Sequence, residues 1–306
     1  MQTQIIARGL LSEIEAIERD SVLYAEPNFA KRVEALDYIE FHVIDRIAGL
    51  VQTSDDPAAL DHLALRATKA RLRLEAVDDA LFRRLRAGIR AGECKGTALR
   101  SLIDSYFGPD SHGSRRQDEP GYDGRDAFLN GLLLNRVVPA ETIAREPEMV
   151  QYQQTPARIA LELVAGARLT AEDVFYDLGC GLGHVPILVN LLSEAVARGV
   201  EVEPAYCDHA RACAAAFELS RVEFITADAR AVDYSQGTVF YLFTSFTGGM
   251  LQEVLARLQG ASLGRRIRLF TYGPCTAQVR RQSWLKSADK SSDQEYRLAA
   301  FESLVS

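Results

Sequence analysis

The chain has 306 residues, 47% of them apolar and 25% charged, which is ordinary for a globular protein with one large domain or two smaller ones. Its net charge of −7 argues against bulk affinity for nucleic acid. No apolar run approaches the roughly 20 residues that a membrane-spanning helix needs. The first residues also lack the pattern of a secretory signal, so we expect a cytoplasmic protein with no membrane partner.

The cysteines do not have the spacing of a metal site. The five of them form no C-x-x-C pair, and no histidine stands beside them at zinc-ligand spacing. We therefore predict neither a metal site nor a disulfide.

The N-terminal third has helical periodicity throughout. Apolar residues recur every three or four positions over 10–17, 33–47 and 58–92, the last as one long helix or two. Another short helix is expected over 97–106, before a Gly-Pro pair. We predict that residues 1–107 form an all-helical domain, a small bundle.

The pattern changes after a segment rich in turn formers, 108–125, which we interpret as a loop or linker. Short β-branched and aromatic runs then alternate with helical stretches. The expected strands are 174–177, 198–202, 222–226, 238–243 and 266–271. This alternation is typical of parallel strands joined by crossover helices. The segments 283–288 and 296–302 predict an antiparallel hairpin at the sheet edge, which completes a second domain over 126–306.

One segment, residues 174–184, carries most of the functional information. An apolar run ends in Asp177, and glycines then occupy every second position, at Gly179, Gly181 and Gly183. An amphipathic segment follows at once. The pattern predicts a buried strand, a tight turn whose backbone is open to a ligand, and a helix.

Two common ligands of such turns are disfavoured. A triphosphate loop ends in Gly-Lys-Ser/Thr, whereas Gly183 is followed by His184 and a valine. A dinucleotide fingerprint needs a third glycine, but that position is His184 counted from Gly179 and Pro186 counted from Gly181.

The remaining pattern, Asp-x-Gly-x-Gly-x-Gly with an acid on the strand, resembles the first motif of the class I S-adenosylmethionine-dependent methyltransferases. Over about 150–306, the resemblance implies a Rossmann-like α/β fold: a seven-stranded, mostly parallel sheet with an antiparallel C-terminal hairpin strand. It also implies S-adenosyl-L-methionine as cofactor, with Asp177 attracting its ammonium group. The cofactor loop would then be Gly179, Cys180, Gly181 and Gly183.

The ends of the next two strands agree with this resemblance. Glu201 ends the second strand, and the two oxygens of a carboxylate suit both ribose hydroxyls; Glu203 is the alternative. Asp228 and Ala229 end the third strand. In the class, such an aspartate lies beside the adenine amino group, and the following backbone N–H reaches a ring nitrogen.

A further element, Tyr152-Gln-Gln-Thr155-Pro, precedes an expected helix. It resembles a segment of the non-SET, telomeric-silencing type of protein-lysine methyltransferases. The resemblance implies that Tyr152 and Thr155 help to close over the cofactor. A helix N-cap followed by proline is the simpler alternative, and both can hold.

The fourth strand end bears on the methyl acceptor. It lacks the Pro-Pro-aromatic sequence of enzymes that methylate base amines, and the clustered carboxylates of metal-dependent O-methyltransferases. It also departs from the asparagine-phenylalanine pair of the telomeric-silencing family. No general base is evident; His184 is expected to be structural, and Tyr241 to pack in the core or line an acceptor channel. The acceptor-site candidates are Tyr152, Phe243, Thr244, Ser245 and Phe246.

We therefore expect an S-adenosylmethionine-dependent methyltransferase. A protein lysine is the favoured acceptor and a small molecule the alternative. A hypothesis of another class is a non-catalytic S-adenosylmethionine-binding protein. The helical half would shape the acceptor site or provide a homodimer contact.

Overall fold

The computed structural model describes residues 2–52, 57–108, 121–134, 137–288 and 295–304. By its internal contacts the chain forms two compact units. They are Met1–Gly88 with Leu102–Pro109, and Ile89–Ser101 with Asp110–Ser306. Most of the expected loop 108–125, namely 109–120, lies outside the described residues, as does 289–294 between the last two strands.

The first unit is helical. Its elements are α1 (Gln2–Arg19), the 3-10 turns η1 (Ser21–Tyr24) and η2 (Glu26–Asn28), α2 (Phe29–Asp37), the π-helical turn η3 (Tyr38–Ile44), α3 (Asp45–Val51) and α4 (Pro57–Arg90). The run expected over 58–92 is thus one long helix, which continues into the second unit. Apolar side chains at helical spacing, such as Leu10, Ile14, Val43 and Leu74, are buried together as its core.

A buried ion pair lies within this helical unit. The Arg32 Nε donates to Asp78 Oδ1 at 2.6 Å, and its Nη1 donates to the backbone oxygens of Leu23 (2.8 Å) and Ala25 (3.0 Å). Arg32 is completely buried. It therefore links α2 to α4 and to the turn between α1 and α2.

The second unit contains a seven-stranded sheet. Its strands are β1 (Val174–Leu178), β2 (Val196–Glu201), β3 (Val222–Thr226), β4 (Val239–Phe243), β5 (Arg268–Tyr272), β6 (Leu285–Ser287) and β7 (Ala299–Ser303). Their order is β3-β2-β1-β4-β5-β7-β6. The first five strands are parallel, and β7 is antiparallel to both β5 and β6. The Rossmann-like α/β fold with an antiparallel C-terminal hairpin, accompanied by a helical N-terminal region, is therefore confirmed.

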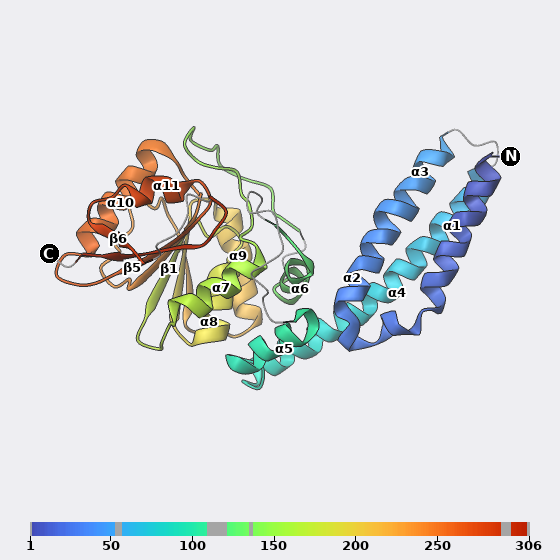
Figure 1. Ribbon diagram of the computed structural model, residues 1–306, viewed down its shortest axis with the longest axis horizontal. Helices are drawn as coiled ribbons and strands as arrows, with labels where there is room; N and C mark the ends of the chain where they lie inside the picture. Colours follow the sequence, from blue (N-terminus) through green and yellow to red (C-terminus); the bar gives the residue numbers. More distant parts are fainter. Residues whose placement is uncertain (1, 53–56, 109–120, 135–136, 289–294, 305–306) are drawn as a thin grey trace. The chain divides into compact units, whose positions relative to one another are not determined.

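Helices pack around this sheet (Figure 1). They are α6 (Gly124–Leu132), α7 (Ala157–Ala167), α8 (His184–Ser193), α9 (Pro204–Ala216), α10 (Gly248–Ala261) and α11 (Cys275–Arg280). One further helix, α5 (Thr97–Phe107), contributes residues to both compact units. Successive side chains of a strand point to opposite faces, so β1 contributes Tyr176 and Leu178 to the core under α10. Asp177 consequently points to the other face. No helix of the described residues is long and apolar enough to span a bilayer.

Candidate functional site

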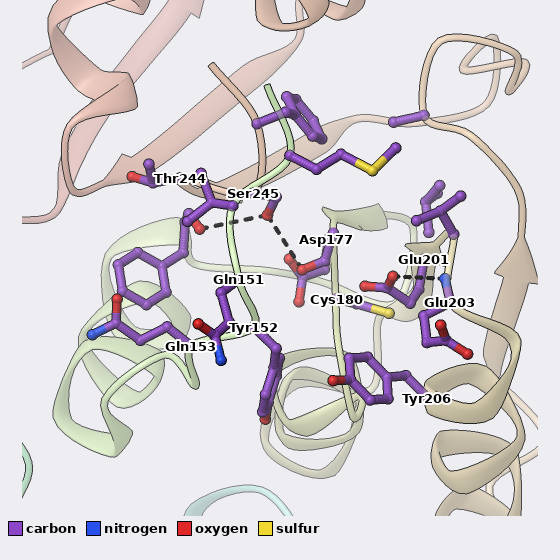
Figure 2. Close-up of a pocket in the computed structure, with 18 of the residues that line it drawn as sticks. Gln151, Tyr152, Gln153, Asp177, Cys180, Glu201, Glu203, Tyr206, Thr244 and Ser245 are labelled. Atoms are coloured by element: carbon purple, nitrogen blue, oxygen red, sulfur yellow. Dashed lines mark hydrogen bonds between the residues drawn. The ribbon is translucent and has the colours of Figure 1, made fainter. Parts of the chain in front are cut away.

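A cavity of about 230 Å³ opens at the carboxyl ends of β1, β2, β3 and β4. In α/β sheets with parallel strands, this edge is where ligands usually bind. The strap, defined here as residues 141–155, provides much of the opposite wall. Figure 2 shows Asp177, Cys180 and Glu201 next to one another, with Glu203 and Tyr206 on one side of them and Thr244 on the other.

The turn after β1 requires its glycines. Gly179, Gly181 and Gly183 all have positive φ angles, of 83°, 52° and 79°, which residues other than glycine rarely adopt. An added Cβ would also lie 2.2 Å from the Ser245 side chain at Gly179, and 2.2 Å from the Tyr152 ring at Gly181. The glycines therefore let β4 and the strap approach the turn closely.

Asp177 is a buried carboxylate without a protein partner. Only 4% of its surface is exposed, and no hydrogen bond or ion pair among the described residues reaches it. Burial, and then the charge of Glu201, raise its pKa well above the ordinary value. Such a group is costly to ionise unless a cation is bound beside it.

Glu201 combines an ordered carboxylate with free acceptor capacity. Its Oε2 accepts the Gly181 N–H at 2.9 Å and its Oε1 accepts the Glu203 N–H at 2.9 Å. Burial raises its pKa, although these two N–H donors act in the opposite direction. Because a carboxylate has about four lone-pair sites, Glu201 keeps acceptor capacity for a donor in the cavity.

Glu203, the alternative to Glu201, is occupied within the protein. Its Oε1 accepts from the Thr142 hydroxyl (2.6 Å) and the Ala205 N–H (3.0 Å). Its Oε2 accepts the N–H groups of Thr142 (2.8 Å) and Ile143 (3.1 Å). Burial alone would raise its pKa, but these donors lower it to about 2. Glu203 therefore holds the strap against the start of α9, and Glu201 is the acid with capacity for a ligand.

Asp228 and Ala229 also line the cavity, beyond the end of β3. The Asp228 carboxylate accepts the Arg230 backbone N–H at 2.8 Å and forms an ion pair with the same arginine, Nη2 to Oδ2, at 2.5 Å. This hydrogen-bonded pair lowers the pKa of Asp228. The carboxylate is thus ionised and fixed in direction.

The aromatic and hydroxyl groups of the strap reach into the site. The Tyr152 ring covers Gly181 and lies 5.3 Å from the Tyr206 ring, centroid to centroid. Its hydroxyl is buried without a hydrogen-bond partner among the described residues, and burial raises its pKa. The Thr155 hydroxyl lies 3.2 Å from that of Tyr241, a fully buried core residue that does not line the cavity.

The residues that follow β4 lie at the other end of the cavity. The Ser245 hydroxyl donates to the backbone oxygen of Leu178 at 2.9 Å, which fastens this strand end to the glycine turn. Thr244 has an unusual φ of 35°, and its hydroxyl donates to the backbone oxygen of Tyr272 at 3.3 Å. Both hydroxyl protons are thus donated to backbone oxygens within the fold.

His184 also has a structural contact. Its Nε2 lies 2.8 Å from Asn130 Oδ1 on α6, and burial lowers its pKa to about 3. The ring is therefore neutral near pH 7 and a poor proton acceptor. No group of three or more potential metal ligands occurs among the described residues.

The structure brings most of the residues predicted from sequence to one cavity. All five acceptor-site candidates line it, as do the cofactor candidates Thr155, Asp177, Gly179, Cys180, Glu201, Asp228 and Ala229. Gly181 and Gly183 support the turn without lining the cavity. Sequence reasoning missed the part of the strap that precedes Tyr152. It also missed Tyr206, Pro274 and Tyr296. No motif marks these positions.

Comparisons with known proteins were made by sequence and by structure. No protein-family profile matches the chain, and no curated protein is similar to it in sequence. An RNA methyltransferase from Salinibacter ruber, solved with S-adenosyl-L-homocysteine, is 22% identical and covers 49% of this chain and 92% of its own, with a TM-score of 0.39.

Two further solved structures have similar values. Precorrin-6y C5,15-methyltransferase from Geobacter metallireducens is 17% identical over 52% of this chain and 93% of its own, with a TM-score of 0.38. Magnesium protoporphyrin IX methyltransferase from Synechocystis, solved with bound S-adenosylmethionine, is 18% identical over 49% and 77%, with a TM-score of 0.38. At this level of likeness, the choice of ligand must rest on the residues of the cavity.

Proposed function

We propose that the chain is an S-adenosylmethionine-dependent methyltransferase. The observation that carries this proposal is the buried, unpartnered carboxylate of Asp177 beside Glu201, at the glycine turn that follows β1. A ligand that fits would supply a cation to Asp177 and hydrogen-bond donors to Glu201. S-adenosylmethionine has an ammonium group, a sulfonium group and a ribose diol, and it supplies an electrophilic methyl group.

The cavity residues divide between the parts of this cofactor. Asp177 would bind the ammonium group and Glu201 the ribose hydroxyls. Asp228 would accept from the adenine amino group, with the backbone N–H of Ala229 directed to a ring nitrogen. The Tyr152 hydroxyl, buried without a partner, provides a further polar contact. The resemblance to class I methyltransferases at these positions supports the same division.

For the acceptor we propose an amine, with a protein lysine favoured over a small molecule. Residues 243–249, at the end of β4 and directly after it, include Phe243 and Phe246 but no carboxylate or histidine. The amine would therefore have to lose its proton through burial, which disfavours the charged form. The aromatic side chains Phe243 and Tyr296, which line the cavity, supply such surroundings. Alignment of the neutral amine with the methyl group can then provide much of the rate enhancement.

Calorimetric titration tests the cofactor. We expect S-adenosylmethionine and S-adenosylhomocysteine to bind with micromolar affinity, and Asp177→Asn and Glu201→Gln each to weaken binding at least tenfold. Asp208→Asn is the matched control, because this carboxylate on α9 is 76% exposed and pairs only with Arg211 among the described residues. Preferential binding of NADH would contradict the proposal.

Methyl labelling of a native lysate with the purified full chain tests the acceptor. We expect label in protein, stable to nuclease and released as methyllysine after hydrolysis. Label found only in small molecules would favour the alternative acceptor, and label removed by nuclease would overturn both. Cofactor binding without any labelled acceptor would favour the non-catalytic binding protein.

A further inference from the structure

Arg230 lies at a junction that the proposed cofactor contacts do not explain. It follows the adenine-side residues Asp228 and Ala229, but it lies outside the cofactor cavity, in a groove beside α10. Its Nε lies 3.0 Å from both oxygens of Asp228. Its Nη2 donates to Asp228 Oδ2 at 2.5 Å and to Glu146 Oε1 at 2.8 Å. One guanidinium thus joins the end of β3 to the strap.

The strap is held at several other points, which differ in burial. The buried carboxylate of Glu203, at the start of α9, accepts the N–H groups of Thr142 and Ile143. Glu148 accepts the N–H groups of Gly249 (3.0 Å) and Met250 (2.6 Å) at the start of α10. By contrast, the Glu146 side chain is 50% exposed and that of Arg230 26% exposed. The Arg230–Glu146 contact is therefore accessible to water and salt.

The Glu146 contact is adjacent to residues that line the cavity. The Met149 N–H donates to the Glu146 backbone oxygen at 3.0 Å, and Met149 pairs with Phe246 in an isolated antiparallel bridge. Met149 and Phe246 both line the cavity. A short turn thus connects Glu146 to the cavity wall.

From this geometry we propose that Arg230 is a positioning residue, which orients Asp228 and holds the strap closed over the cavity through Glu146. The inference rests on the proposed function, because the ligand retained by the strap is the cofactor. Arg230 itself touches neither the cofactor nor the acceptor. Its five-donor planar group can serve both carboxylates at once, whereas a lysine ammonium is a single point charge.

Hydrogen–deuterium exchange of the cofactor-free full chain tests the strap contact without any ligand. We expect exchange within 141–150 to be faster in Arg230→Gln and in Glu146→Gln than in the unmodified protein. Arg257→Gln, which removes another arginine of the same groove on α10, should leave this exchange unchanged. Unchanged exchange in both strap variants would overturn the proposal.

Stopped-flow dissociation of S-adenosylhomocysteine tests the consequence for the cofactor. We expect Glu146→Gln to dissociate about threefold to tenfold faster, and salt to accelerate dissociation less than it does in the unmodified protein. Arg230→Gln should have a larger effect, since Asp228 also loses its partner, and Arg230→Lys should be intermediate. If Glu146→Gln dissociates S-adenosylhomocysteine at the same rate and with the same salt dependence as the unmodified protein, the proposal is overturned and the cofactor assignment stays intact. If the unmodified protein binds no S-adenosylhomocysteine, the proposed function fails, and the exchange experiment alone decides the strap contact.

Discussion

Ionisation of Asp177 should control the pH dependence of cofactor binding. Burial and the charge of Glu201 raise its pKa in the free protein, whereas a bound ammonium favours the ionised form. Binding should therefore release protons, and affinity should fall as the pH drops through this raised pKa, at a higher pH than for an ordinary carboxylate. Calorimetric titrations between pH 5 and 8, in buffers of different ionisation enthalpy, measure both quantities.

Asp177→Asn distinguishes the contribution of Asp177 to this pH dependence from that of Glu201. The variant should bind S-adenosylhomocysteine weakly at every pH, and the remaining pH dependence should come from Glu201, whose pKa is also raised by burial. Cofactor binding that releases no protons in the unmodified protein would mean that Asp177 does not meet a cation.

The glycine turn allows a second prediction at the scale of single residues. Gly181→Ala places a Cβ against the Tyr152 ring, at a φ of +52° that alanine rarely adopts. We expect a loss of about 1–3 kcal/mol in the free energy of unfolding and at least tenfold weaker cofactor binding. Denaturant titration and calorimetry measure the two effects.

Two further variants identify the cause. Gly181→Asn tolerates a positive φ better than alanine, so an equal loss in both would assign the effect to the Tyr152 contact. Gly166→Ala on α7 is the matched control, because nothing lies within 4 Å of its added Cβ. It should be neutral or stabilising by up to about 1 kcal/mol. A Gly181→Ala protein as stable as this control would contradict the argument.

Among the elements, the strap depends most on contacts with residues distant in sequence. Glu203→Gln replaces the carboxylate that accepts from Thr142, Ile143 and Ala205. We expect it to cost on the order of 2 kcal/mol in the free energy of unfolding at pH 7. Because the folded-state pKa of Glu203 is lowered to about 2, this stabilisation is present above about pH 4.5 and is lost as the pH falls towards 2.

Urea unfolding at pH 7, 5 and 3.5 measures this difference. The gap between the unmodified protein and Glu203→Gln should narrow at the lowest pH, whereas Glu253→Gln on the exposed side of α10 should show no gap at any pH. A gap that stays constant with pH would mean that the ionised form of Glu203 is not the stabilising one.

The elements themselves differ in how far sequence could predict them. Strands β1 to β5 and the hairpin follow from alternating β-branched and aromatic runs, and the cofactor turn from its glycines and Asp177. The strap has no such periodicity: its position depends on Glu203, Arg230 and Phe246, which the sequence leaves far from it. The π-helical turn Tyr38–Ile44 is also invisible in a pattern that continues smoothly from α2 to α3.

The sequence does not decide between Glu201 and Glu203, because the two acids are two positions apart and would point to the same face of an extended strand. The difference lies in hydrogen bonds that only the folded chain provides, because Thr142 and Ile143 saturate one of the two. Similarly, the sequence predicts Ser245 as an acceptor-site residue, but its hydroxyl donates to the backbone oxygen of Leu178. The type of residue at a strand end thus predicts the chemistry of the site. It does not predict whether a given side chain contacts the ligand or another part of the protein.

At the scale of the whole molecule, the domain boundary predicted at residue 107 stays a prediction, since α4 and α5 each contribute to both compact units. The role of the helical half in acceptor choice or dimer formation likewise remains a proposal. Each unit nevertheless has its own hydrophobic core. Domains with separate cores can unfold in separate transitions.

Arg32→Ala tests this independence in the full chain. It leaves Asp78 buried opposite a shortened side chain, and removal of one partner of a buried ion pair costs roughly 3–5 kcal/mol. We expect calorimetry to show a lower unfolding temperature for the helical unit. S-adenosylhomocysteine should still raise the unfolding temperature of the other unit. Lys31→Ala, at the exposed neighbouring position on α2, should change neither. Because Asp177 and Glu201 lie in the second unit, cofactor affinity should be retained; affinity that falls together with the helical transition would show that the two units fold and bind as one.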